Sequence, residues 1–323
     1  MSRFSSVRVF VACRLPTECR ALFSQAFDAR FNEHDRTLTP DELIHESAGA
    51  QVLVGTATDR LDATAIARLS SRIRIVATYS VGHDHIDLAA ARDRRLTVLY
   101  TPDVLSDACA DTALLLMLGA ARRVVESGDL VRSGAWTGWT PLQLLGRDVH
   151  GARRGIIGMG RIGRAIARRV RGFDMAVHYH NRSRLAAEVE AEARFHPTLD
   201  TLLAVSDFLC IACPASPETR HLIDADRIEQ LPQGAIVVNI ARGEVIDDRA
   251  LIPALRSGRL FAAGLDVFEN EPDIAAAYRT LPNVFALPHI GSSTLETRVA
   301  MARLLVDGIA ASLAGEAAGN RLA

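Results

Sequence analysis

The chain has 323 residues, a length that at about 150 residues per domain suggests two domains. Apolar residues make up 49% of it and charged residues 23%, proportions typical of globular rather than disordered or fibrous proteins. The 37 basic and 38 acidic residues leave a net charge of −1, too little positive charge to hold a nucleic acid. No apolar run reaches the roughly 18 residues of a membrane span, and the opening MSRFSSVRVF lacks the apolar core of a signal peptide. We therefore expect a cytoplasmic protein with no membrane or nucleic-acid partner.

The basic residues are all arginines, because the sequence contains no lysine. This excludes enzymes that need a P-loop lysine, a Schiff-base lysine or a lysine general base. The five cysteines, an odd number without a signal peptide, indicate reduced thiols. Cys210 and Cys213 form a CxxC inside a predicted strand, where residues three apart point to opposite faces, so we expect structural thiols. The His-x-His pairs at 83–85 and 178–180 have no third ligand nearby, and no metal is predicted.

The first hundred residues alternate short apolar runs with amphipathic helical patterns such as 62–70. This alternation is typical of parallel βα units. The strands predicted here are 7–12, 51–55, 74–78 and 97–100.

A long, very apolar helix is predicted over 103–123, and its composition implies burial between domains or subunits. The next stretch, 126–154, is polar, contains Trp136 and Trp139 and lacks clear periodicity. Such a stretch is typical of an arm or a binding loop.

A second βα series begins at Arg154, and its six predicted strands favour a doubly wound sheet. The strands are 154–158, 175–180, 207–213, 235–240, 262–268 and 284–288. Helices are predicted over 161–171, 185–193, 224–231 and 248–257, and the last 30 residues, from about 292, are predicted to form one amphipathic helix.

Gly158, Gly160 and Gly163 spell G-M-G-R-I-G between a predicted strand and a predicted helix. Glycines in this pattern let backbone N–H groups and the helix N-terminus approach a pyrophosphate. The strand–turn–helix context favours a dinucleotide site over a merely tight turn.

The next strand ends at His180 and is followed by Asn181, Arg182, Ser183 and Arg184. An NAD site would place a carboxylate here for the ribose 2′-hydroxyl, whereas Arg182 and Ser183 suit a 2′-phosphate. The sequence thus favours NADP(H). The alternative is a solvated basic turn in a protein that uses NAD without contacting the 2′ position.

Four segments together resemble the D-isomer-specific 2-hydroxyacid dehydrogenases, and they occur in that family's order along essentially the whole chain. They are S-V-G-H-D-H-I-D (80–87), G-M-G-R-I-G (158–163), V-N-I-A-R-G-E-V-I-D (238–247), and G-L-D-V-F-E-N-E-P (264–272) with L-P-H-I-G-S-S (287–293). The branch most resembled is the glyoxylate/hydroxypyruvate reductases, whose preference for NADPH agrees with Asn181–Ser183.

Three residues are candidates for catalysis. Arg242 follows a predicted strand, where a guanidinium can grip a substrate carboxylate bidentately, and the resemblance makes it the substrate-orienting arginine. His289 follows the last predicted strand and needs a carboxylate to stabilise its protonated form. Glu271 fits that role in the family's Arg…Glu…His order, with Glu269 as the alternative. His289 would then protonate the keto oxygen as hydride adds to the carbon, and act as base in reverse.

The resemblance also implies contacts for further residues. Val81 and Gly82 would clamp the substrate carboxylate through their backbone, and Asp266 would lie near the nicotinamide carboxamide. Trp139 is the candidate for a tryptophan that borders the partner's substrate pocket in a homodimer, with ordinary packing as the alternative. The remaining implied cofactor contacts are Arg161, Ile162, Cys213, Pro214, Ile240, Ala241 and Gly291.

We therefore expect an α/β protein of two Rossmann-like domains with doubly wound parallel sheets. An NADP-binding domain, 102–290, would be inserted into a discontinuous flavodoxin-like substrate domain, 1–101 plus 291–323. The expected reaction is NADPH-dependent reduction of glyoxylate to glycolate or hydroxypyruvate to D-glycerate. The alternatives are a reductase of larger 2-keto acids such as phenylpyruvate or hydroxyphenylpyruvate, and a non-catalytic, corepressor-like protein that senses dinucleotides.

Overall fold

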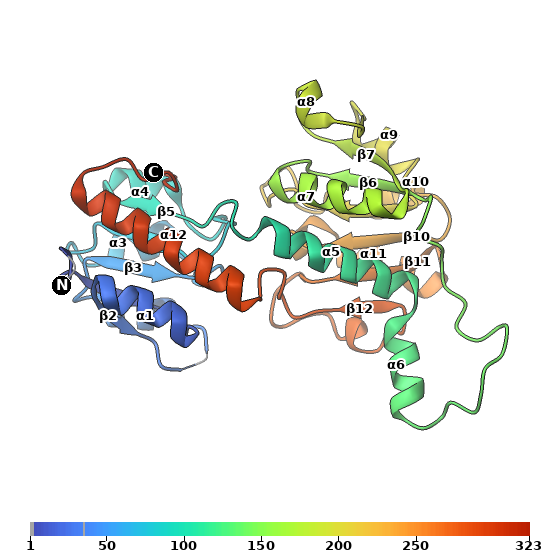
Figure 1. The fold of residues 1–323 in the computed structure, drawn as a ribbon, viewed down its shortest axis with the longest axis horizontal. Coiled ribbons are helices and arrows are strands. Elements are labelled where there is room, and N and C mark those ends of the chain that lie inside the picture. Colours follow the sequence, from blue (N-terminus) through green and yellow to red (C-terminus); the bar gives the residue numbers. More distant parts are fainter. Residues whose placement is uncertain (1–2, 35) are drawn as a thin grey trace. The chain divides into compact units, whose positions relative to one another are not determined.

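A computed structural model describes residues 3–34 and 36–323 and divides the chain into two compact units. One unit comprises the residues up to Leu105 together with Ser292–Ala323, and the other is Ser106–Gly291 (Figure 1). Each unit is an α/β structure built on one parallel sheet.

The first unit has five parallel strands in the order β2-β1-β3-β4-β5, which is the flavodoxin-like order. The strands are β1 Arg8–Val11, β2 Asp28–Phe31, β3 Val52–Gly55, β4 Ile75–Thr78 and β5 Thr97–Leu99. Helices α1 (Thr17–Ala26) and α12 (Leu295–Ala314) pack against each other over one face (Figure 1). On the other face, strand residues such as Phe10, Leu53 and Val76 share a core with α2 (Pro40–Ser47), α3 (Ala63–Arg68) and α4 (Leu88–Asp93).

The C-terminal helix is shorter than predicted. It ends at Ala314 because Gly315, with φ +76°, takes the left-handed conformation that terminates helices. The residues after it return to the sheet, where Arg321 forms an antiparallel bridge with Leu99 of β5. The side-chain amide of Asn320 donates to the carbonyl of Tyr100 and fixes this return.

The second unit has seven parallel strands in the order β12-β11-β10-β9-β6-β7-β8. The chain runs outward from β6 in both directions, as in the Rossmann fold, and the sheet is doubly wound. The strands are β6 Arg153–Ile157, β7 Ala176–His180, β8 Arg194–Phe195, β9 Phe208–Ile211, β10 Ala235–Asn239, β11 Leu260–Leu265 and β12 Val284–Ala286. The predicted fold class is confirmed.

Helices cover both faces of this sheet. On one face α5 (Ser106–Ala121) and α7 (Arg161–Val170) enclose a core with alternate strand residues such as Ile156, Cys210 and Val238. On the other face the intervening strand residues pack under α9 (Leu199–Leu203), α10 (Ala225–Gln230) and α11 (Asp248–Ser257). Cys210 and Cys213 are both buried free thiols, and they belong to opposite cores.

Three further features differ from the sequence predictions. The edge strands β2 and β8 were missed, because β2 carries Asp28 and Arg30 on its exposed face and β8 spans only Arg194–Phe195. The helix predicted over 185–193 shrinks to one turn, α8 (Ala187–Glu190). The stretch expected to lack regular structure opens with helix α6 (Val124–Arg132), whose residues are all at least partly exposed.

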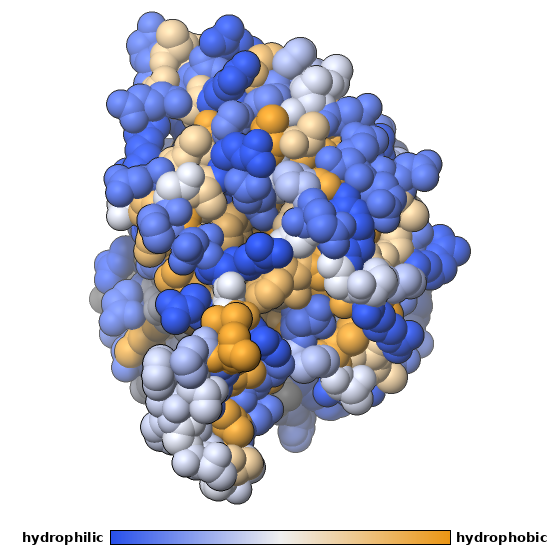
Figure 2. Space-filling view, turned by 90° about the vertical axis from the view of Figure 1, so that its right-hand side faces the viewer, coloured by the Kyte–Doolittle hydropathy of each residue, from blue (hydrophilic) through white to orange (hydrophobic). Residues whose placement is uncertain are grey.

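Beyond α6, an arm of irregular chain, residues 133–152, projects from the sheet of its own unit (Figure 1). Its apolar residues lie largely in solvent, with Trp139 78% and Leu142 81% exposed. Figure 2 views the molecule from the side on which the arm lies and shows hydrophobic side chains exposed there. Within the described part of the chain, no helix is both long and apolar enough to span a membrane.

Candidate active site

The predicted site residues of the second unit follow its strands at one edge of the sheet. All seven strands are parallel, and the paired residues Ile157, Ile211, Asn239 and Leu265 align their carboxyl ends. Ligands of open α/β sheets bind outside such ends. The loops after β6, β9, β10, β11 and β12 therefore gather their side chains at the edge where this fold places a ligand.

The glycine loop after β6 is shaped for a close backbone approach. Gly158 has φ +94°, and a Cβ atom there would lie 2.6 Å from the backbone nitrogen of Cys213. Gly160 precedes α7 without a side-chain cap, and a Cβ atom on it would meet open space. The first turn of α7 thus presents N–H groups with room beside them, which fits the pyrophosphate of a dinucleotide. Arg161 and Ile162 are the first two residues of that helix.

The end of β7 is tied to this loop. The side-chain oxygen of Asn181 accepts a hydrogen bond from the backbone of Met159 at 2.7 Å. Arg182 and Ser183 are exposed beside it. Arg184 differs, because its guanidinium is paired with Glu190 at 2.8 Å, and the pKa of that carboxyl is lowered by the pairing. Arg182, but not Arg184, is placed to meet a ligand without breaking an internal contact.

Arg242 is presented by the turn after β10. Asn239, the last residue of β10, shapes this turn by accepting from the backbone of Ala241 at 3.0 Å and donating to the carbonyl of Arg242 at 2.9 Å. A Cβ atom on Gly243 would lie 1.8 Å from the backbone carbon of Phe268, so only glycine fits there. The segment that carries Arg242 therefore packs directly on the loop after β11.

Glu271 and His289 meet across two loops. Oε2 of Glu271 lies 2.8 Å from Nδ1 of His289, and Oε1 accepts from the backbone of Phe268 at 2.7 Å. His289 has φ +55°, a conformation that is uncommon for residues other than glycine and recurs at functional sites. This carboxylate–imidazole pair can fix the ring orientation and stabilise the protonated ring.

Asp266 holds the backbone next to His289. It is 1% exposed, and its two carboxylate oxygens accept from the backbone nitrogens of Ile290 and Gly291, each at 2.7 Å. Burial raises the pKa of this carboxyl, while the two hydrogen bonds oppose the rise. Asp266 thus secures the loop that carries His289, and its contact with a nicotinamide stays a prediction.

The other predicted site residues take varied positions. Ile240, Ala241 and Cys213 are buried at the carboxyl ends of the strands, and burial raises the pKa of the Cys213 thiol to about 11. Pro214 follows, exposed. Val81 and Gly82 belong to the first unit, in the bend after β4, where the Ser80 hydroxyl donates to the carbonyl of Gly82 at 2.6 Å.

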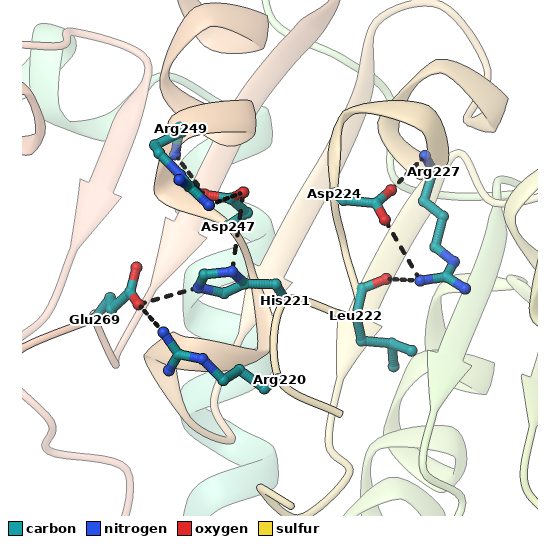
Figure 3. Close-up of polar contacts among 8 residues, drawn as sticks. All are labelled: Arg220, His221, Leu222, Asp224, Arg227, Asp247, Arg249 and Glu269. Atoms are coloured by element: carbon teal, nitrogen blue, oxygen red, sulfur yellow. Dashed lines mark hydrogen bonds and ion pairs between the residues drawn. The ribbon is translucent and has the colours of Figure 1, made fainter. Parts of the chain in front are cut away.

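Glu269, the alternative partner of His289, contacts other residues. Its carboxylate lies 3.0 Å from Nε2 of His221 and 3.3 Å from Arg220 (Figure 3). No pattern in the sequence indicated a role for His221, which is 48 residues from Glu269. Among the residues that the structure describes, no group of three His, Cys, Asp or Glu side chains is arranged to hold a metal ion.

Comparisons with known proteins agree with this geometry. The model of a family described as "D-isomer specific 2-hydroxyacid dehydrogenase, NAD binding domain" matches residues 114–291. A glycerate dehydrogenase from Hyphomicrobium methylovorum is 39% identical over 96% of this chain and 97% of its own.

Two solved structures are also similar. One, from Polaromonas sp. JS6 66 and described as a D-isomer specific 2-hydroxyacid dehydrogenase, has 51% identity and a TM-score of 0.93, covering 98% of this chain and 99% of its own. The other is an NADPH-dependent glyoxylate/hydroxypyruvate reductase from Sinorhizobium meliloti in complex with NADP and malonate. It has 31% identity and a TM-score of 0.87, covering 98% of this chain and 97% of its own.

The fold, the glycine loop and these comparisons define a nicotinamide-dinucleotide oxidoreductase. The chain belongs to the D-isomer-specific 2-hydroxyacid dehydrogenase family.

Proposed function

We propose that the protein reduces small 2-keto acids, glyoxylate and hydroxypyruvate above all, with NADPH as the reductant and His289 as the general acid. The observation that carries this proposal is the 2.8 Å contact between Glu271 and His289. It lies at the same sheet edge as Arg242 and the glycine loop. The names of the relatives, a glycerate dehydrogenase and a glyoxylate/hydroxypyruvate reductase, supply the substrate class.

When bound, a reduced nicotinamide supplies the hydride that adds to the keto carbon. The chain's own residues bind the substrate and protonate its keto oxygen. The guanidinium of Arg242 would orient the substrate through its carboxylate. The carboxylate of Glu271 accepts a hydrogen bond from Nδ1 of His289. The proton transferred to the keto oxygen therefore leaves from Nε2. The carboxylate stabilises the imidazolium before transfer and fixes the ring during it.

The loop after β7 supports NADPH over NADH. Asn181, Arg182 and Ser183 offer hydrogen-bond donors and one positive charge where an NAD site has a carboxylate. The internal carboxylate nearby, Glu190, is occupied by Arg184. Arg182 also exerts an attraction on Glu218, and the pKa of that carboxyl is lowered, mainly by a hydrogen bond with Ser216.

Several expectations stay predictions. Val81 and Gly82 as the carboxylate clamp, Trp139 at a partner's substrate pocket, the homodimer and the cytoplasmic location rest on the sequence alone. The exposed apolar side chains of the arm are compatible with a dimer contact.

Initial rates with NADPH and with NADH, each against glyoxylate, hydroxypyruvate, pyruvate and phenylpyruvate, test the proposal. We expect turnover with NADPH on the first two acids and much less with NADH. Activity mainly on phenylpyruvate would move the substrate to larger keto acids and leave the chemistry in place. Tight dinucleotide binding without turnover of any acid would favour the non-catalytic binding protein.

A further inference from the structure

His221 joins the loops that follow three neighbouring strands (Figure 3). It lies on the segment after β9, and its Nε2 is 3.0 Å from the carboxylate of Glu269, on the loop after β11. Its Nδ1 is 3.9 Å from the carboxylate of Asp247, on the segment after β10. The side chains of His221, Glu269 and Asp247 are 23%, 18% and 16% exposed, so this cluster is partly shielded from water.

The backbone fixes His221 in this place. Its N–H donates to the carbonyl of Glu244 at 2.7 Å, and Ile223 forms a parallel bridge with Ile246. The segment after β9 therefore lies along the segment that follows Arg242. The imidazole reaches the loop after β11 from a support that is itself hydrogen-bonded.

Glu269 belongs to the loop 268–271, which also carries Glu271, the proposed partner of His289. Two residues further on, Glu271 accepts from the backbone of Phe268 at 2.7 Å and contacts His289 at 2.8 Å. The other side of the loop rests on Gly243, where no Cβ atom fits. The contact of Glu269 with His221 therefore fixes a short loop between Arg242 on one side and His289 on the other.

A second cation also reaches Glu269, but it is a weaker anchor. Arg220 lies 3.3 Å from the carboxylate, and its side chain is 55% exposed. Long exposed ion pairs contribute little, because water screens them and the side chain loses entropy. The shorter contact from the more enclosed imidazole carries most of the restraint.

We propose that His221 is a positioning residue, which acts through Glu269 to hold the loop 268–271 so that Glu271 meets His289. The kinetic part of this inference rests on the proposed function, while the restraint on the loop does not. A shift of about 1 Å in a reacting group can reduce the rate about 100-fold. Loss of His221 should therefore lower kcat more than it changes the binding of the dinucleotide.

The test compares His221→Ala and His221→Gln with Arg227→Ala in the full chain. Gln keeps an N–H donor directed at Glu269 without the ring. Arg227 is the matched control, because it pairs with Asp224 at 3.6 Å and donates to the carbonyl of Leu222 at 2.9 Å, away from the loop 268–271 (Figure 3). Hydrogen exchange of peptides covering 266–272, kcat with glyoxylate, and the Kd for NADPH are measured on each.

We expect His221→Ala to speed exchange in 266–272 and to lower kcat about 10- to 100-fold, with the Kd for NADPH changed less than about 2-fold. His221→Gln should recover part of both effects, and Arg227→Ala should show neither. Unchanged exchange in His221→Ala would overturn the proposal, as would loss of kcat equal to that of Arg227→Ala. A wild-type protein without turnover would refute the proposed function, while the exchange measurement would still decide the role of His221.

Discussion

Glu271 and His289 lie 18 residues apart in the chain, on loops that follow different strands, and their side chains meet at 2.8 Å. The second carboxylate oxygen of Glu271 is held by the backbone of Phe268. The carboxylate therefore cannot rotate freely away from the imidazole. With Nδ1 engaged, Nε2 is the ring nitrogen available for proton transfer, in the manner of carboxylate–histidine pairs in other enzymes.

Glu271→Gln should lower kcat for keto-acid reduction about 10- to 1,000-fold, because an amide keeps the shape but does not stabilise the imidazolium. The Kd for NADPH, measured by fluorescence titration in the same buffer, should change less than about 2-fold. Glu229→Gln is the matched control, since Glu229 pairs with Arg259 on the surface of the same unit. Equal kcat in the two variants would exclude Glu271 from the mechanism.

Arg182→Ala should raise the KM for NADPH about 10- to 100-fold and leave the KM for NADH nearly unchanged, because only the first carries a 2′-phosphate. Arg184→Ala serves as the control. Its guanidinium is already paired with Glu190, so we expect lower thermal stability and little change in the NADPH to NADH ratio. A parallel rise in both KM values for Arg182→Ala would refute the 2′-phosphate site.

Two glycines of the loop after β6 should respond differently to alanine. A methyl group added at Gly160 would contact no other protein atom, so Gly160→Ala should fold with a Tm near that of the wild type. Its Kd for NADPH should rise about 10-fold or more, because the methyl group occupies the approach to the pyrophosphate. Gly158→Ala should lower the Tm itself, since φ is +94° and Cys213 is 2.6 Å from the added atom. Unimpaired binding by Gly160→Ala would place the dinucleotide elsewhere.

Arg154, on β6, is fully buried, and among the residues described its guanidinium has no carbonyl or carboxylate partner but interacts with the Cys210 thiol. The pKa of the Cys210 thiol is raised by burial, and both the charge of Arg154 and a hydrogen bond from it oppose that rise. A buried charge whose partner is a neutral thiol rather than a carboxylate is costly. Arg154→Met should therefore raise the free energy of unfolding by about 1–4 kcal/mol, measured by urea denaturation.

The adjacent arginine provides the control for that experiment. Arg153 pairs with Asp207 at 2.7 Å, and this pairing lowers the pKa of the carboxyl. Arg153→Met should give no gain in stability. A loss of stability in Arg154→Met would mean that the guanidinium has a favourable partner in the folded protein.

The stability of the second unit should fall below neutral pH because of two histidines. Nδ1 of His178 lies 2.9 Å from Nε2 of His196, and the pKa of each is lowered, first by burial. The charges of His196, Arg194 and Arg153 lower the pKa of His178 further, while Asp207 opposes that shift. Arg194 and His180 lower the pKa of His196 further, while a backbone hydrogen bond with Thr201 opposes that shift. In the unfolded chain these rings take up protons as the pH falls through about 6.5, whereas the folded chain resists protonation. The folded state therefore loses stability as the pH falls from about 7.5 to 5.5.

Replacing both rings, as His178→Gln with His196→Gln, should reduce this loss in urea denaturation curves at the two pH values. The exposed His45, in the first unit, gives a control variant, His45→Gln, that should keep the wild-type pH dependence. An unaltered pH dependence in the double variant would show that the pair titrates alike in the folded and unfolded chains.

Much of the architecture was predictable because each buried strand is a continuous apolar run between helical patterns. Edge strand β2 was not, since only one of its four residues is buried. The return of the C-terminus beside β5 depends on long-range pairing, such as that of Arg321 with Leu99, which leaves no local pattern.

The candidate site was also predictable only in part. Glycine spacing and residues just past strand ends indicated the dinucleotide loop, Arg242 and His289. The contact of His221 with Glu269 spans 48 residues and is formed by the packing of three loops. The ion pair of Arg184 with Glu190 could not be predicted either, although the two residues are only six apart in the sequence. It depends on how the chain after β7 folds back.

In the proposed reaction His289 donates the proton to the keto oxygen of the substrate. Single-turnover oxidation of bound NADPH by glyoxylate, followed at 340 nm in wild type and His289→Ala, tests it most directly. We expect the rate of hydride transfer to fall about 100- to 10,000-fold in the variant, with the Kd for NADPH retained. A variant that oxidises NADPH at close to the wild-type rate would contradict the assignment of His289 as the general acid.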